Sequence, residues 1–146
     1  WLLGDEGSAV GVGRAALRHV LSEPSPLLDV ILAATGVATA DDLLRYVYTD
    51  DSRARIAALA QVVTRAARDG HAVARRIVQL EAQAMAACID RAAPPIPAAC
   101  RLGGALFGDA GYLAHVLHHI QTPFIDIQVV HDICGAAAQS KAIRPW

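Results

Sequence analysis

Two stretches with strand character lie near the C-terminal end of the sequence, on either side of a helical stretch. Residues 98–102 are apolar enough for a short buried strand and end before two glycines, and residues 125–130 alternate in polarity. Residues 109–120 between them have the apolar spacing of a helix. Two consecutive strands joined by a helix usually pair in parallel. We therefore expect a parallel edge of an α/β domain.

The residues before this edge predict helices only. Serine, threonine and aspartate caps, together with prolines and glycines, divide the chain into five helical segments. Ser8, Pro26 and Thr39 mark three of the beginnings, and Gly36 marks one end. The expected helices cover 9–21, 26–34, 40–46, 52–68 and 71–92. A proline-rich connector follows at 93–97, and a last helix is expected to begin at Gly135.

The composition indicates one domain with an apolar excess. The chain has 146 residues, of which 54% are hydrophobic and 18% charged, with a formal net charge of −1. This charge argues against nucleic acids and anionic membranes as partners. No segment approaches the roughly 20 apolar residues of a membrane span. The apolar excess favours contact with another lobe or subunit, and a homodimer is one such arrangement.

The cysteines and histidines indicate neither a disulfide framework nor a metal site. Cys88, Cys100 and Cys134 are odd in number and far apart, which is typical of a reducing cytoplasm. Three histidines within 115–119 share a helix face. We interpret them as a polar or interface face, because no glutamate is placed among them.

A short acidic turn with the sequence LGDEGS, at residues 3–8, is the strongest candidate binding motif. Its glycines let the backbone turn tightly around two carboxylates, and an ionised aspartate accepts hydrogen bonds from hydroxyl groups. The plain alternative is that the acids only favour the N-terminus of the next helix. The pair Gly103-Gly104 either lets a flat ring approach the backbone or forms an ordinary turn.

Four stretches, in this order, resemble the C-terminal lobe of the N-acetylglucosamine kinase group within the BadF/BadG/BcrA/BcrD ATPase family. They are LGDEGSA at 3–9 with its continuation GVGRAAL at 11–17, AARDGHAVA at 66–74, LGGAL at 102–106 and GAA at 135–137. The chain departs from the family at Val10-Gly11, where an aromatic pair is usual, and at His71, where aspartate is common. The second change is expected to affect only a helix cap.

The resemblance implies a fold and a set of site residues. Residues 1–146 would form a single domain, α/β in class and mostly helical with a few short strands. This domain would be part of the C-terminal ribonuclease-H-like lobe of an actin-like ATPase fold. Asp5 would contact the hydroxyls of an amino sugar, with Glu6 as a second contact or as a brace for the loop. The implied nucleotide-binding residues are Ala57, Gly103, Gly104 and Gly108.

The function implied is that of a cytoplasmic, ATP-dependent amino-sugar kinase that phosphorylates N-acetylglucosamine or glucosamine, with Mg²⁺ on the phosphates. The catalytic base and the phosphate loops are expected in an N-terminal lobe outside this sequence, so this chain alone is expected to be inactive. Two alternatives remain: an ATPase activator of a 2-hydroxyacyl-CoA dehydratase or aromatic-CoA reductase, and a nucleotide- or sugar-sensing module without turnover. The cysteine spacing and the acidic motif argue against the activator.

Two further groups have structural interpretations. Arg53, Arg55 and Arg65 predict a solvated face, from which one arginine near Ala57 could reach a nucleotide phosphate. An apolar stripe on the long helix that includes Leu80 predicts core positions.

Overall fold

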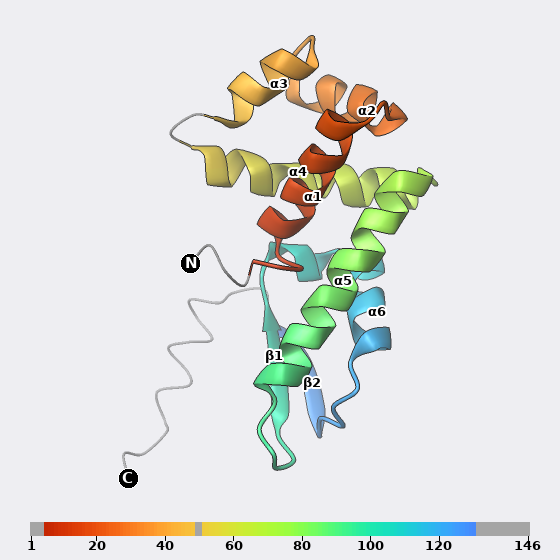
Figure 1. Cartoon of the computed structure of the whole chain (residues 1–146). Coiled ribbons are helices and arrows are strands. Elements are labelled where there is room, and N and C mark those ends of the chain that lie inside the picture. Colours follow the sequence, from red (N-terminus) through yellow and green to blue (C-terminus); the bar gives the residue numbers. More distant parts are fainter. Residues whose placement is uncertain (1–4, 49–50, 131–146) are drawn as a thin grey trace.

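The computed structural model describes residues 5–48 and 51–130. This part of the chain forms six α-helices, one 3₁₀ helix and two β-strands (Figure 1). They are α1 (Ala9–Ser22), α2 (Pro26–Thr35), α3 (Ala40–Val47), α4 (Ser52–Arg68), α5 (Ala72–Ala92), β1 (Ala99–Gly103), η1 (Ala105–Gly108), α6 (Ala110–His119) and β2 (Asp126–Val130). The expected mostly helical fold with a few short strands is confirmed.

The helix boundaries follow the predicted caps. The Ser8 hydroxyl accepts a hydrogen bond from the Gly11 amide at 3.1 Å at the start of α1. Pro26 lies in the first turn of α2, and Gly36 ends that helix with a φ of 71°. His71 takes the N-cap position of α5, as its place in the sequence predicts. The predicted helix at 135 lies outside the described residues.

The helices form an upper layer of α1 to α4 and a lower part in which α5 and α6 accompany the two strands (Figure 1). The helices α1 and α4 approach each other closely, because a Cβ at Gly13 would collide with the backbone carbonyl of Ile56. Buried apolar residues from α1 to α6 and η1 form one core cluster. Leu80 is 52% exposed, so its predicted core position is wrong; it lies on the outer face of α5.

The two strands pair in parallel, as the strand–helix–strand order predicts. Ala99 is opposite Asp126 and Leu102 is opposite Val129, so β1 begins one residue later than expected. The prediction of a buried strand is wrong, because only Leu102 of β1 is fully buried. Within the described residues the sheet has two strands, and alternate residues such as Arg101 point away from the core. No helix within the described ranges is long and apolar enough to span a membrane.

Candidate functional site

The acidic loop, which we define as residues 5–8, is a tight turn directly before α1. The Ser8 amide donates to the Asp5 carbonyl oxygen at 3.0 Å and closes the turn. Gly7 has a φ of 75°, in the region that side chains other than glycine rarely adopt. The glycine is therefore required by the path of the backbone at this turn.

Two side chains from distant helices hold the peptide groups of Gly7. The Gly7 amide donates to the Glu81 carboxylate on α5 at 2.8 Å, and the Tyr112 hydroxyl on α6 donates to the Gly7 carbonyl oxygen. Tyr112 is fully buried. Burial, and next the negative charge of Glu81, raise the pKa of Tyr112 well above its usual range, so this hydroxyl stays a donor. The loop is thus fixed against α5 and α6.

The carboxylate of Asp5 lies between two arginines. Its Oδ1 is 3.0 Å from Nη2 of Arg53 on α4, and its Oδ2 is 3.9 Å from Nη2 of Arg14 on α1. The side chain is only 13% exposed, and Oδ2 is buried without a hydrogen-bond partner among the described residues. A buried carboxylate oxygen normally has such a partner. Oδ2 therefore keeps an acceptor position that no described residue uses.

Glu6 differs from Asp5 in its surroundings. It is exposed, and no hydrogen bond or ion pair joins it to the described residues. The brace for the loop comes from Glu81 and not from Glu6, which corrects that sequence alternative. The solvated arginine face is also only partly right. Arg53 pairs with Asp5. Arg55 donates to the Tyr46 carbonyl oxygen, and its guanidinium stacks over the aromatic ring of Tyr46.

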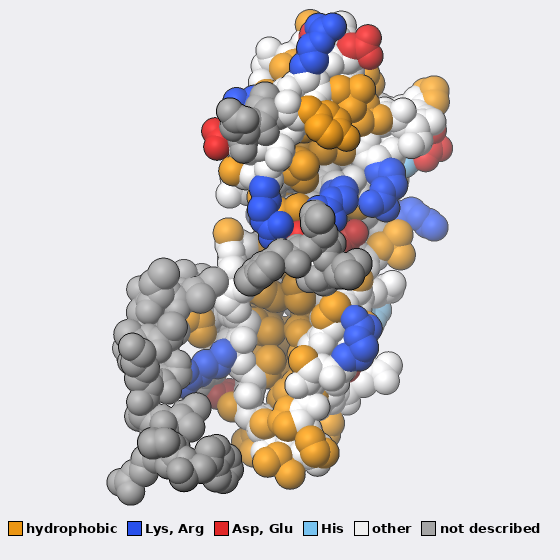
Figure 2. All heavy atoms as spheres, turned by 60° about the vertical axis from the view of Figure 1, so that its left-hand side comes forward, with side chains coloured by type: hydrophobic (Ala, Val, Ile, Leu, Met, Phe, Trp, Pro, Cys, Tyr) orange, Lys and Arg blue, Asp and Glu red, His pale blue; other side chains and the backbone are white. Residues whose placement is uncertain are grey.

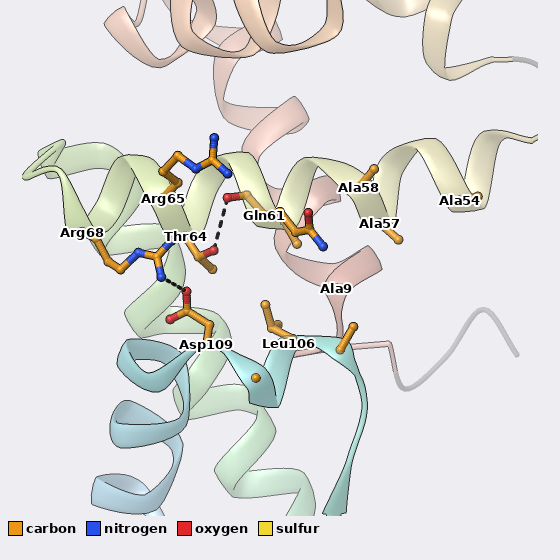
Figure 3. A pocket seen from close by; sticks show the side chains of 13 residues that line it. Ala9, Ala54, Ala57, Ala58, Gln61, Thr64, Arg65, Arg68, Leu106 and Asp109 are labelled. Carbon is orange, nitrogen blue, oxygen red and sulfur yellow. Dashed lines mark hydrogen bonds and ion pairs between the residues drawn. The ribbon is translucent and has the colours of Figure 1, made fainter. Parts of the chain in front are cut away.

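A cleft of about 510 Å³ lies between α4 and the segment formed by η1 and the start of α6 (Figure 3). Small residues make most of its walls. The lining residues are Ala9, Ala54, Ala57, Ala58, Ala60, Gln61, Thr64, Arg65, Arg68, Ala105, Leu106, Gly108 and Asp109. Two of the four predicted nucleotide-binding residues, Ala57 and Gly108, therefore line the same cleft from opposite sides. Gly103 and Gly104 precede its wall without lining it.

Polar groups are concentrated at one end of the cleft (Figure 3). There Nη1 of Arg68 lies 3.2 Å from Oδ2 of Asp109, and Oδ1 of Asp109 accepts from the Tyr112 amide at 3.0 Å as the cap of α6. Arg65, which also lines the cleft, is exposed, and its guanidinium points away from the Arg68–Asp109 pair in Figure 3. The cleft can take a flat ring between its alanine walls, with an anionic group toward the arginines.

The acidic loop and the cleft are neighbours in the structure. Ala9 lines the cleft and directly follows the loop, and Ala54 lines it and directly follows Arg53, the partner of Asp5. A ligand in the cleft and a ligand at Asp5 would thus lie next to each other. This adjacency comes from the crossing of α1 and α4.

Sequence reasoning missed Glu81 and Tyr112. Both lie in helices whose apolar spacing alone explains them, and their partner Gly7 is 74 residues away from one and 105 from the other. The available signal for Glu81 was an acid in the middle of α5, directly before the core position Ala82. Cys88 and Cys100 are free thiols, and Cys134 lies outside the described residues.

The described ranges contain no group of three or more histidine, cysteine, aspartate or glutamate side chains that could hold a metal ion. The three histidines of α6 are in this part of the chain, and the rings of His118 and His119 contact each other at 5.0 Å between centroids.

No protein-family model matches the chain, and no curated protein matches it at a significant level.

Proposed function

We propose that this chain is the sugar- and nucleotide-binding part of an ATP-dependent amino-sugar kinase of the cytoplasm. In this proposal it belongs to the ribonuclease-H-like C-terminal lobe of an actin-like ATPase fold. The observation that carries it is the adjacency of two sites: a cleft lined mostly by small side chains, and the buried Asp5 carboxylate, whose Oδ2 has no hydrogen-bond partner among the described residues. Phosphoryl transfer needs a nucleotide and a hydroxyl held side by side.

The acidic loop suits the sugar. Arg53 keeps the Asp5 side chain in place, and Oδ2 of Asp5, which has no hydrogen-bond partner among the described residues, would accept a hydrogen bond from a sugar hydroxyl. Because Glu81 and Tyr112 hold Gly7, the position of this oxygen is set before a ligand arrives. Glucosamine and N-acetylglucosamine both offer adjacent hydroxyls for this contact, with the 6-hydroxyl as the expected acceptor of phosphate.

The cleft suits the nucleotide. Ala57 and Gly108 leave room for a flat ring between α4 and η1, and Arg65 is exposed at the polar end, where phosphates would be favoured. Mg²⁺ would be held through those phosphates. When bound, ATP supplies the phosphoryl group. This chain's own residues orient the nucleotide and the sugar. In the proposed kinase, the N-terminal lobe supplies the general base.

The first test measures nucleotide binding to this chain by calorimetry with ATP, ADP and GTP in the presence of Mg²⁺. Ala57→Trp fills the cleft and is expected to weaken ATP binding at least tenfold. Ala87→Trp, at an exposed position of α5 away from the cleft, is the matched control and should bind as the wild type does. Equal binding by both variants would exclude the cleft as the nucleotide site.

The second test measures ADP release by the full-length protein that contains this chain, over a panel of glucosamine, N-acetylglucosamine and glucose. An amino sugar is expected to stimulate turnover. Asp5→Asn should raise the KM for sugar far more than the KM for ATP, by about tenfold or more for one lost charged hydrogen bond. Absence of sugar-stimulated turnover, with intact ATP binding, would favour a sensing module instead.

A further inference from the structure

A groove between α1, α3 and the start of α4 has the features of a second binding site. Its volume is about 340 Å³, and it shares no lining residue with the cleft beside η1. The apolar floor includes Leu17 and Val47, which are 6% and 4% exposed. Leu21 and Leu44 at the rim are each more than one third exposed, so the floor continues into apolar surface.

Two arginines stand over this apolar floor. Arg14 and Arg18 are one turn apart on α1, so they lie on the same face and both line the groove. The described residues that line it include no acidic side chain. Arg18 is exposed, and no carboxylate among the described residues is within ion-pair distance of it. Figure 2 shows arginine side chains gathered across the middle of one face, next to apolar side chains.

We propose that this groove binds an amphipathic anion, namely a carboxylate on an unbranched medium-length acyl chain. The chain would lie along Leu17 and Val47, and the carboxylate would lie between Arg14 and Arg18. Small-molecule sites are typically apolar hollows with a few placed polar groups, and the volume is near the lower end of their range. The charge of Arg18, which has no carboxylate partner among the described residues, favours an anion over a neutral lipid or an uncharged peptide.

Arg14 connects this groove to the acidic loop. Its Nη2 is 3.9 Å from Oδ2 of Asp5, so a carboxylate in the groove would compete with Asp5 for the same guanidinium. Removing the charge of Asp5 is therefore expected to tighten binding in the groove. This inference goes beyond the proposed kinase function and holds or fails independently of it.

The test is calorimetry of the chain with hexanoate, octanoate and decanoate, with 1-octanol as the neutral match for octanoate. Affinity should rise about two- to fourfold with each added methylene until the groove is filled. Octanoate should bind several-fold more tightly than 1-octanol. Arg18→Gln should weaken octanoate binding about threefold to fivefold, whereas Asp5→Asn should strengthen it by a similar factor. Arg45→Gln, an exposed arginine of α3 outside the groove, should change nothing.

Several results would overturn the proposal. They are the absence of binding by any acyl acid, equal affinity for octanoate and 1-octanol, and equal effects of Arg18→Gln and Arg45→Gln. Analytical sedimentation provides one further result that would overturn the proposal. If the chain forms a dimer that Leu44→Lys dissociates, and octanoate does not compete with it, the groove is an interface between copies instead. Folding of each variant is checked by circular dichroism, and Asp5→Asn supplies a gain of affinity that misfolding cannot produce.

Discussion

The acidic loop and the cleft lie side by side, but they are held in different ways. The loop depends on contacts from three other helices: Glu81 and Tyr112 hold Gly7, and Arg53 holds Asp5. The cleft is a space left by small side chains on α4 and η1. Among the described residues, a single ion pair, between Arg68 and Asp109, crosses its polar end.

This difference suggests a division of tasks between the two sites. A loop fixed by buried hydrogen bonds presents its free oxygen in one place, which suits recognition of a small polar ligand. A cleft lined by alanines has few polar groups that would orient a ligand, so it selects mainly by shape, which suits a large flat group. Substitutions should therefore cost stability at the loop and cost mainly ligand affinity in the cleft.

The largest expected difference is between two glycine substitutions. In Gly7→Ala, the new Cβ would meet the Glu81 carbonyl oxygen at 2.7 Å, and the residue would keep a φ of 75°. We expect this to lower the free energy of unfolding by about 3 kcal/mol or more, from strain and overpacking together.

Gly108→Ala is the matched substitution in the cleft wall. Nothing lies within 4 Å of the Cβ position, so we expect a change within about 0.5 kcal/mol. Urea unfolding of both variants measures the difference. Comparable stability of the two would mean that the loop is not fixed as the structure shows.

The second comparison concerns polar side chains. Glu81→Ala leaves the partly buried Gly7 amide without its acceptor and is expected to lower the free energy of unfolding by about 2 kcal/mol. Glu81→Gln keeps an acceptor oxygen and should recover about half of this loss. Gln61→Ala, at an exposed position of the cleft, should change stability by no more than about 0.5 kcal/mol. A loss at Gln61 as large as that at Glu81 would contradict the comparison.

The local parts of the structure could be predicted from the sequence. Caps such as Ser8 and the C-terminal Gly36 act within a few residues, so helix boundaries were correct to one or two positions. The parallel pairing of β1 and β2 was correct because a helical crossover leaves little choice. The prediction that β1 is buried was wrong, because the burial of a strand depends on how many strands the sheet has.

The contacts that hold the candidate site could not be predicted in this way. Glu81 on α5 fits a helical pattern without any reference to Gly7, and Tyr112 fits as a core residue of α6. Their pairing with the loop depends on where three helices cross, which no local pattern specifies. Arg53 was likewise interpreted as solvated, because its partner Asp5 is 48 residues away.

The smallest and most specific expected effect is the pH dependence caused by Tyr112. Burial raises the pKa of this phenol in the folded state, so its neutral form contributes stability that is fully present below the unfolded pKa of about 10. As the pH rises above that value, the unfolded chain loses this proton first, and stability falls. Tyr112→Phe loses the hydrogen bond to Gly7 and about 1 kcal/mol at neutral pH, but it should lack this alkaline loss. Tyr48→Phe, at a position 82% exposed, should keep both the stability and the alkaline loss of the wild type. Urea unfolding between pH 7 and about 11 measures the free energy of unfolding of the wild type and both variants. An equal alkaline loss of stability in the wild type and in Tyr112→Phe would show that another group is responsible.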